Sequence, residues 1–299
     1  MALVLECQRV AFASYSDLTS DEGKKHILAA KEFIPYRHYM FCVAARLVYL
    51  SMKDVDEECI IINVRQCCSP LNHIDHVIQI KRYVRASREL LGKIASIDGR
   101  HYPEVNVTLD NGKLVSYASM FEFLLGVDAH ANYTREVDEL LRLDLRYVGQ
   151  TDITEQYFRF DTHGTYAREA DRLMKGRPDQ ELFIKLLQFN DMVVLLDLED
   201  PTPEETEDLR KLIEPMWEEM ESQWVTFIEA AMIGGMSPPL NKHYKGSFPT
   251  SEHTTYSSFI NGPIDDLYLI IDEDLRRYST LICGEYRRTF ACTIKLDGC

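Results

Sequence analysis

The chain has 299 residues, of which 45% are hydrophobic, and it carries a formal net charge of -15. This length is enough to bury one large core or two smaller ones. A chain this acidic is not expected to coat nucleic acid non-specifically, and no apolar run approaches the roughly 20 residues that a membrane-spanning helix needs.

The N-terminus and the cysteines indicate the cellular compartment. Residues 1–6 lack the basic region and the long apolar stretch of a signal peptide. The chain has eight cysteines but no Cys-x-x-Cys pair, so we expect free thiols in a reducing compartment rather than disulfides or a zinc site. These features predict a cytoplasmic protein that does not contact a membrane.

The first half of the chain predicts a mixture of strands and helices. Apolar runs predict strands at 3–12 and 59–64, and a hairpin of 105–109 with 113–117 around Asp110-Asn111-Gly112. Apolar spacing and capping residues predict helices at 21–33, 36–52 and 71–97. The last of these helices would carry Lys81, Arg82 and Arg85 on one face, a basic stripe that suits either solvent or DNA phosphates.

The second half predicts further strands around two helices. Strands are expected at 141–148, 183–189, 192–198, 267–271, 280–282 and 289–296, and the pair 183–189 and 192–198 should form a hairpin at Asn190-Asp191. One helix is expected at about 154–174. A second should begin near Pro203, where proline is tolerated, and continue to about Met232.

Acidic residues are concentrated around the start of that second helix. Between Asp191 and Glu221 there are twelve acidic residues, opposed by only Arg210 and Lys211. Such a segment suits a solvated helix, a surface for a protein partner or a mimic of DNA.

Four residues have the chemistry that phosphodiester cleavage needs. Arg159 and His163 are four positions apart on the predicted 154–174 helix, so they would project from one face. A guanidinium fits phosphate oxygens, and Glu229 offers a hard oxygen ligand to hydrated Mg²⁺. Tyr147, at the end of a predicted strand, could orient or activate the attacking water if a nearby cation lowers its pKa. Together these groups suit metal-assisted hydrolysis.

The order of these residues resembles the GIY-YIG nuclease family. The matching stretches are Tyr147-Val148-Gly149-Gln150-Thr151, Arg159-x-x-x-His163, Glu229, and Pro239-Leu240-Asn241, within about residues 141–245. The resemblance implies a small three-stranded sheet flanked by helices. It also implies that Tyr147 takes part in catalysis, Arg159 contacts the scissile phosphate, His163 assists proton transfer, Glu229 binds Mg²⁺ or Mn²⁺, and Asn241 closes the site near the substrate.

The sequence therefore predicts an α+β protein with two units. Residues 1–128 would form an N-terminal α/β recognition domain, and 129–299 a GIY-YIG-like nuclease domain with an acidic helical insertion near 199–222. The predicted function is a divalent-metal-dependent endonuclease acting on DNA rather than RNA, with Lys81, Arg82, Arg85 and Asn241 binding substrate. The alternative is a catalytically inactive module that binds a protein or a nucleic acid, because no Gly-Ile-Tyr precedes Tyr147 at short spacing and the chain is acidic.

Overall fold

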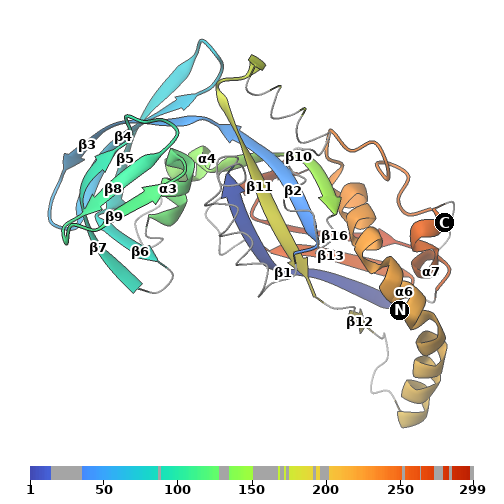
Figure 1. Cartoon of the computed structure of the whole chain (residues 1–299). Helices are drawn as coiled ribbons and strands as arrows, with labels where there is room; N and C mark the ends of the chain where they lie inside the picture. Colours follow the sequence, from blue (N-terminus) through green and yellow to red (C-terminus); the bar gives the residue numbers. More distant parts are fainter. Residues whose placement is uncertain are drawn as a thin grey trace.

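The structure is a computed structural model in which most of the chain is β-sheet. Strands account for 51% and helices for 22%. The structure describes residues 1–14, 36–86, 89–127, 135–150, 168, 172, 175–190, 193–195, 202–250, 253–262, 264–272, 279–282 and 285–296. A large curled sheet and a second lobe of two smaller sheets make up the molecule (Figure 1).

The large sheet has nine strands in the order β15-β14-β10-β2-β11-β1-β13-β16, with β12 also paired to β1. Their bounds are β1 Ala2–Ser14, β2 His38–Ala45, β10 Arg142–Gln150, β11 Gln180–Phe189, β12 Val193–Leu195, β13 Asp266–Asp272, β14 Ser279–Ile282, β15 Glu285–Arg287 and β16 Thr289–Lys295. The β1–β13 and β10–β14 pairs are parallel, and the other pairs are antiparallel.

The second lobe contains a three-stranded and a four-stranded sheet. The first comprises β3 Leu47–Asp54, β4 Cys59–Cys67 and β5 His73–Lys81; the second comprises β6 Tyr83–Ala86, β7 Glu89–Asp98, β8 Val105–Leu109 and β9 Leu114–Tyr117. Helix α3 (Met120–Gly126) packs on this lobe, and α4 (Arg135–Leu140) precedes β10. Strand β8 alternates buried and partly buried residues, as expected for a sheet with one covered face.

Strand β2 lies at the centre of the large sheet and is buried on both faces. Met40 and Cys42 belong to the main core cluster, whereas Tyr39, Phe41 and Val43 belong to a smaller cluster on the opposite face. Burial on both sides removes the apolar–polar alternation that identifies a strand. This explains why the prediction of a helix at 36–52 was wrong.

The longest helix, α6 (Pro203–Met236), continues the main core. Its C-terminal part, including Phe227, Ala231 and Ile233, is buried. The helix ends before Ser237, which has a φ of 50°, and the buried Pro238. The short helices η2 (Thr254–Tyr256) and α7 (Ser257–Ile260) pack against α6, and the rings of Phe227 and Phe259 are stacked with their centroids 4.0 Å apart.

The structure corrects the predicted fold class. It has the nine-stranded sheet in place of a small three-stranded sheet flanked by helices. The N-terminal region was predicted to be α/β, but from β1 to β9 its described residues form strands and no helix. The predicted division at residue 128 runs through the large sheet, because β1 and β2 pair with β10 and β11.

Two predicted elements are also corrected. The region 71–97 forms β5, β6 and β7 instead of a helix, because its apolar residues suit paired strands as well as a helical face. Strands β11 and β12 do not form the predicted hairpin, because both pair antiparallel with β1, one after the other. Asn190 lies between β11 and β12, and its side chain accepts a hydrogen bond from the N–H of Glu6 at 2.9 Å.

Candidate functional site

Tyr147 lies on the face of the large sheet that carries the smaller apolar cluster. Strand β10 pairs antiparallel with β2, and the pairing register shifts between Leu145 and Tyr147. Such a bulge bends a strand and re-aims the side chains that follow it. The Tyr147 ring then lies opposite Phe41, with 5.5 Å between the ring centroids. Tyr147 is partly buried, so it is not a free surface residue.

Gly149 allows Tyr39 to reach Tyr147. Tyr39 is the cross-strand partner of Gly149, and a Cβ atom at position 149 would lie 2.5 Å from the Tyr39 hydroxyl oxygen. Without a side chain at 149, the Tyr39 ring lies over β10, and its hydroxyl is hydrogen-bonded to that of Tyr147. Tyr39 was not predicted, because nothing in the sequence indicates which residue faces Gly149.

Glu229 approaches the same point from α6. The backbone N–H of Gln150, the last residue of β10, donates a hydrogen bond to the Glu229 carboxylate. The negative charge of Glu229 acts on both Tyr147 and Tyr39. Two residues that are far apart in the sequence, Tyr147 and Glu229, are therefore brought together where α6 crosses the end of β10.

Burial determines the electrostatics of this tyrosine–glutamate cluster, formed by Tyr39, Tyr147 and Glu229. It raises the pKa of Glu229 to about 7, against a smaller opposing effect of the Gln150 N–H. Burial, and secondarily the charge of Glu229, raises the pKa of the Tyr147 hydroxyl, and burial likewise raises that of Tyr39. A tyrosine that activates water needs a lowered pKa, so both hydroxyls are arranged to stay protonated, whereas Glu229 exchanges a proton near neutral pH.

The surroundings of Glu229 do not fit the Mg²⁺ or Mn²⁺ implied by the resemblance. Its neighbours on α6, Ile228 and Ala230, are fully buried apolar residues. A carboxyl group with a pKa of about 7 is partly protonated at neutral pH, whereas these metals bind ionised oxygen ligands. Within the residues that the structure describes, no group of three or more His, Cys, Asp or Glu side chains could hold a metal ion.

Asn241 supports β10 from the side opposite β2. Its side-chain oxygen accepts from the Val148 N–H at 2.9 Å, and its side-chain nitrogen donates to the Val148 carbonyl at 2.8 Å. The N–H of Leu240 also donates to the carbonyl of Arg146 at 3.0 Å. The paired part of β14 ends opposite Asp144, so residues 240–241 take the place of a neighbouring strand. Asn241 is 7% exposed, and its observed role is to hold the backbone next to Tyr147.

The remaining predicted site residues are not part of the tyrosine–glutamate cluster as described. Arg159 and His163 lie outside the described residues. Lys81 ends β5, and Arg82 follows it and forms an ion pair with Asp54. Arg85 lies in β6. Lys81 and Arg85 are therefore on strands of the second lobe and Arg82 lies between them, so the three residues do not form the helical stripe that the sequence predicted.

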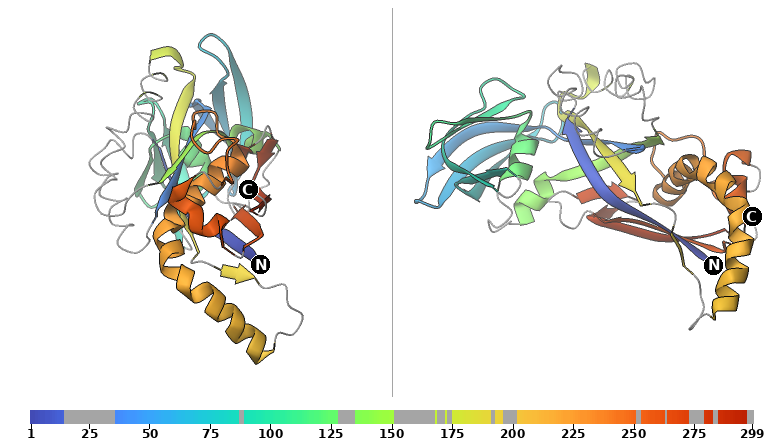
Figure 2. Two further views of the ribbon diagram at one scale, coloured as in Figure 1. Left: turned by 90° about the vertical axis from the view of Figure 1, so that its right-hand side faces the viewer. Right: turned by 60° about the horizontal axis from the view of Figure 1, so that its bottom comes forward.

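From Pro203 onward, the acidic segment forms the first half of α6. The described side chains of this half are all exposed up to Glu219, and Met220 is the first that is buried, at 1% exposure. In Figures 1 and 2 this half extends beyond the sheets, next to the N-terminus of the chain. The exposed charged residues are Glu204, Glu207, Asp208, Lys211, Glu214 and Glu219.

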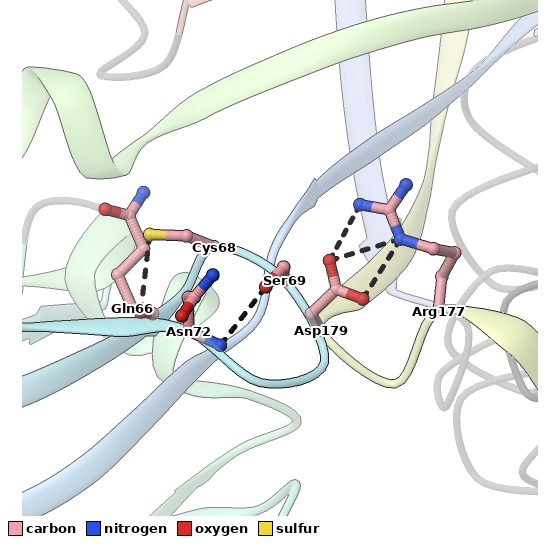
Figure 3. A network of polar contacts seen from close by, with 6 residues as sticks. All are labelled: Gln66, Cys68, Ser69, Asn72, Arg177 and Asp179. Carbon is pink, nitrogen blue, oxygen red and sulfur yellow. Dashed lines mark hydrogen bonds and ion pairs between the residues drawn. The ribbon is translucent and has the colours of Figure 1, made fainter.

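A polar cavity of about 220 Å³ lies where the large sheet meets the second lobe. Its lining includes Cys67 and Cys68 from the second lobe and Asp144 and Asp179 from the large sheet. Asp179 is 2% exposed, and Arg177 donates to both of its carboxylate oxygens beside the β4–β5 turn (Figure 3). Neither thiol forms a disulfide, and the same holds for the other four cysteines in the described part of the chain.

Comparison of the chain with protein-family models, curated proteins and solved structures found no match. The GIY-YIG resemblance is therefore neither supported nor refuted by a relative, although the sheet it implies is not the one observed. Among the described helices, none is long and apolar enough to cross a membrane.

Proposed function

We propose that this chain is a protein-binding component and that the N-terminal half of α6 is its docking element. The observation that carries this proposal is the position of residues 203–219. They continue a helix that is anchored in the core at Phe227, yet their described side chains are exposed and they extend beyond the sheets. A helical segment of this length with exposed side chains is only marginally stable by itself in water, because packing supplies most helical stability.

The sequence of this half is amphipathic. Leu209, Leu212, Ile213 and Met216 follow one another at intervals of three, one and three residues, so their positions share one side of a helix. The positions of Glu207 and Glu214 fall on the other side. A helix with one apolar and one acidic side fits a partner with an apolar groove edged by Lys and Arg, the mode in which a helix docks into a groove.

The apolar face is tested by photo-crosslinking in an extract of the source cells, with a benzophenone amino acid replacing the exposed Glu204. We expect one protein to dominate the crosslinked products, and the purified partner to bind the full chain directly. Replacing Leu209 and Leu212 together by Ser should weaken that binding at least about tenfold, because two buried leucines contribute more than ~1.4 kcal/mol. The matched control replaces Leu71 and Leu114 by Ser and should leave binding unchanged, because these leucines are 92% and 61% exposed in the second lobe, away from α6.

Charge is tested with a second matched pair of variants. Neutralising Glu207, Glu214 and Glu219 to Gln should slow association and reduce its dependence on salt, because rim charges act mainly on the association rate. Neutralising the exposed Glu57, Glu58 and Glu104 changes the net charge equally and should leave binding unchanged. Equal losses in both triple variants, or in both double-serine variants, would contradict the proposed docking element.

A second candidate function is phosphodiester hydrolysis at the tyrosine–glutamate cluster. The observation that favours it is that Glu229, with a pKa raised to about 7, can exchange a proton near neutral pH, as a general acid or base does. Supercoiled plasmid with Mg²⁺ or Mn²⁺ would be nicked by the wild type and left intact by Glu229→Ala. Nicking that survives this substitution, or that neither protein produces, excludes the assigned site. For either function we place the protein in the cytoplasm, which suits its free thiols.

A further inference from the structure

Strand β5 forms one edge of the three-stranded sheet in the second lobe. It pairs antiparallel with β4, and among the described residues no other strand pairs with it. It runs for nine residues, from His73 to Lys81, without an irregularity in its register, whereas strands of about 5–6 residues are the most common. The outer side of β5 is therefore a long and regular strand edge.

The hydrogen bond that extends the β4–β5 ladder shows which backbone groups of β5 point outward. The Arg82 N–H donates to the Glu58 carbonyl at 2.8 Å, in the same register as the β4–β5 pairs. Hydrogen-bonded pairs alternate along an antiparallel ladder, so the even-numbered residues of β5 bond to β4 and the odd-numbered residues do not. The N–H and C=O groups of Asp75, Val77 and Gln79 therefore point away from β4, toward the open edge.

The features that usually prevent a strand edge from pairing are weak on β5. The strand contains no proline, and Ile74 and Val77 are 52% and 63% exposed. The acid on its outer face, Asp75, is neutralised by Arg65 of β4, whose Nε and Nη2 donate to the two carboxylate oxygens at 2.7 and 2.9 Å. Exposed apolar residues beside outward-pointing backbone groups favour the addition of a further strand.

We propose that β5 is a dimer interface, at which it pairs antiparallel with β5 of a second copy of this chain about a twofold axis at Val77. The three-stranded sheets of the two copies then form one continuous sheet of six strands. This interface is separate from the proposed docking element, because the second lobe and the acidic half of α6 lie at opposite ends of the molecule (Figure 1).

The sequence of β5 complements itself in this arrangement, which is why the occupant is a second copy. Val77 meets Val77 of the other copy and Asp75 lies opposite Gln79, so the outward-pointing backbone groups of the two strands bond to each other. Asp75 also lies diagonal to Lys81 of the other copy, within reach of that long side chain. A parallel arrangement would instead bring like charges together. The antiparallel twofold pair thus joins apolar to apolar and acid to base.

The dimer is tested by sedimentation of the full chain over a range of concentrations. We expect the mass to rise from 34.7 kDa to twice that value as the concentration increases. Val77→Lys should raise the dissociation constant at least about tenfold, because it removes the apolar contact and places two like charges on the axis. Leu114→Lys is the matched control and should leave the dissociation constant unchanged, since Leu114 is 61% exposed on β9, another edge strand of the same lobe. Equal effects of the two substitutions would contradict the assigned edge.

Hydrogen exchange of the wild type identifies the edge without any variant. The amides of Asp75, Val77 and Gln79 should exchange more slowly at concentrations where the dimer forms, whereas those of Ile78 and Ile80, which bond to β4, should be protected in monomer and dimer alike. A dimer in which the first three amides exchange at the monomer rate would overturn the proposal in favour of another surface. A chain that stays monomeric up to about 1 mM would overturn it in favour of a strand from another protein.

Discussion

The ring of Tyr39 occupies the space that a side chain at position 149 would fill. Gly149 lies opposite Tyr39 in the β2–β10 pair, and a Cβ there would meet both the hydroxyl oxygen and the adjoining ring carbon at 2.5 Å. A cross-strand glycine covered by an aromatic ring stabilises a sheet locally and fixes the position of the ring. Here it also places the hydroxyl against Tyr147, next to Glu229.

Gly149→Ala should destabilise the protein by about 1–3 kcal/mol, because the added methyl group forces the Tyr39 ring or the β10 backbone to move. Urea unfolding measures the change. Gly176→Ala is the control, because a Cβ at position 176 meets nothing within 4 Å. The interpretation fails if the two alanine variants have equal stability.

Asn241→Ala should cost about 2–4 kcal/mol, since the buried N–H and C=O of Val148 both lose their partner. The Val148 amide should also exchange its hydrogen faster. Asn63→Ala is the comparison, because Asn63 donates to Ser51 at an exposed position and its loss should cost under ~1 kcal/mol. Unchanged exchange at Val148 would show that residues 240–241 do not support β10.

Glu229→Gln should make stability less dependent on pH between about 4.5 and 7. The folded-state pKa of about 7 exceeds the ordinary 4.5, so the contribution of Glu229 is present below 4.5 and is lost as the pH rises through 7. Because Glu229 is partly exposed, we expect about 1–2 kcal/mol between pH 5 and pH 8.5. This difference is measured by denaturant unfolding of the wild type and the variant at both pH values. Parallel pH profiles would mean that the carboxyl group is hydrated in the folded state.

His38→Gln should reduce the loss of stability that the wild type shows as the pH falls from 6.5 toward 4. His38 is 2% exposed, its Nε2 lies 2.9 Å from the carbonyl of Val225, and burial lowers its pKa to about 4. The stability from a neutral His38 is present above the ordinary value of 6.5 and is lost as the pH falls toward 4. Between those values the wild type should lose about 3 kcal/mol that the variant keeps. Thermal unfolding of the wild type and the variant across this pH range tests the expected loss. If the stability of both proteins depends on pH with equal slopes, a buried neutral histidine at position 38 is excluded.

Local patterns in the sequence were sufficient where an element is decided by its own residues. The hairpin around Asp110-Asn111-Gly112 is confirmed as β8 and β9, and the acidic helix is confirmed as α6. The turn residues and the proline at the first helical position act within a few residues of where they stand. The strands at 141–148 and 267–271 are confirmed for the same reason, since one covered face produces alternation along the strand.

The sequence by itself determined the existence and type of such elements, and it picked out Tyr147, Glu229 and Asn241 as residues of interest. Only the tertiary structure decided that β1 and β2 join β10 and β11 in one sheet, that Asn241 holds the backbone of β10, and that Tyr39 completes the tyrosine–glutamate cluster. The physical reason is that strand pairing and burial depend on residues far away in the chain. Whether Glu229 keeps an ordinary carboxyl pKa or one near 7 is likewise set by what α6 packs against, which no local pattern records.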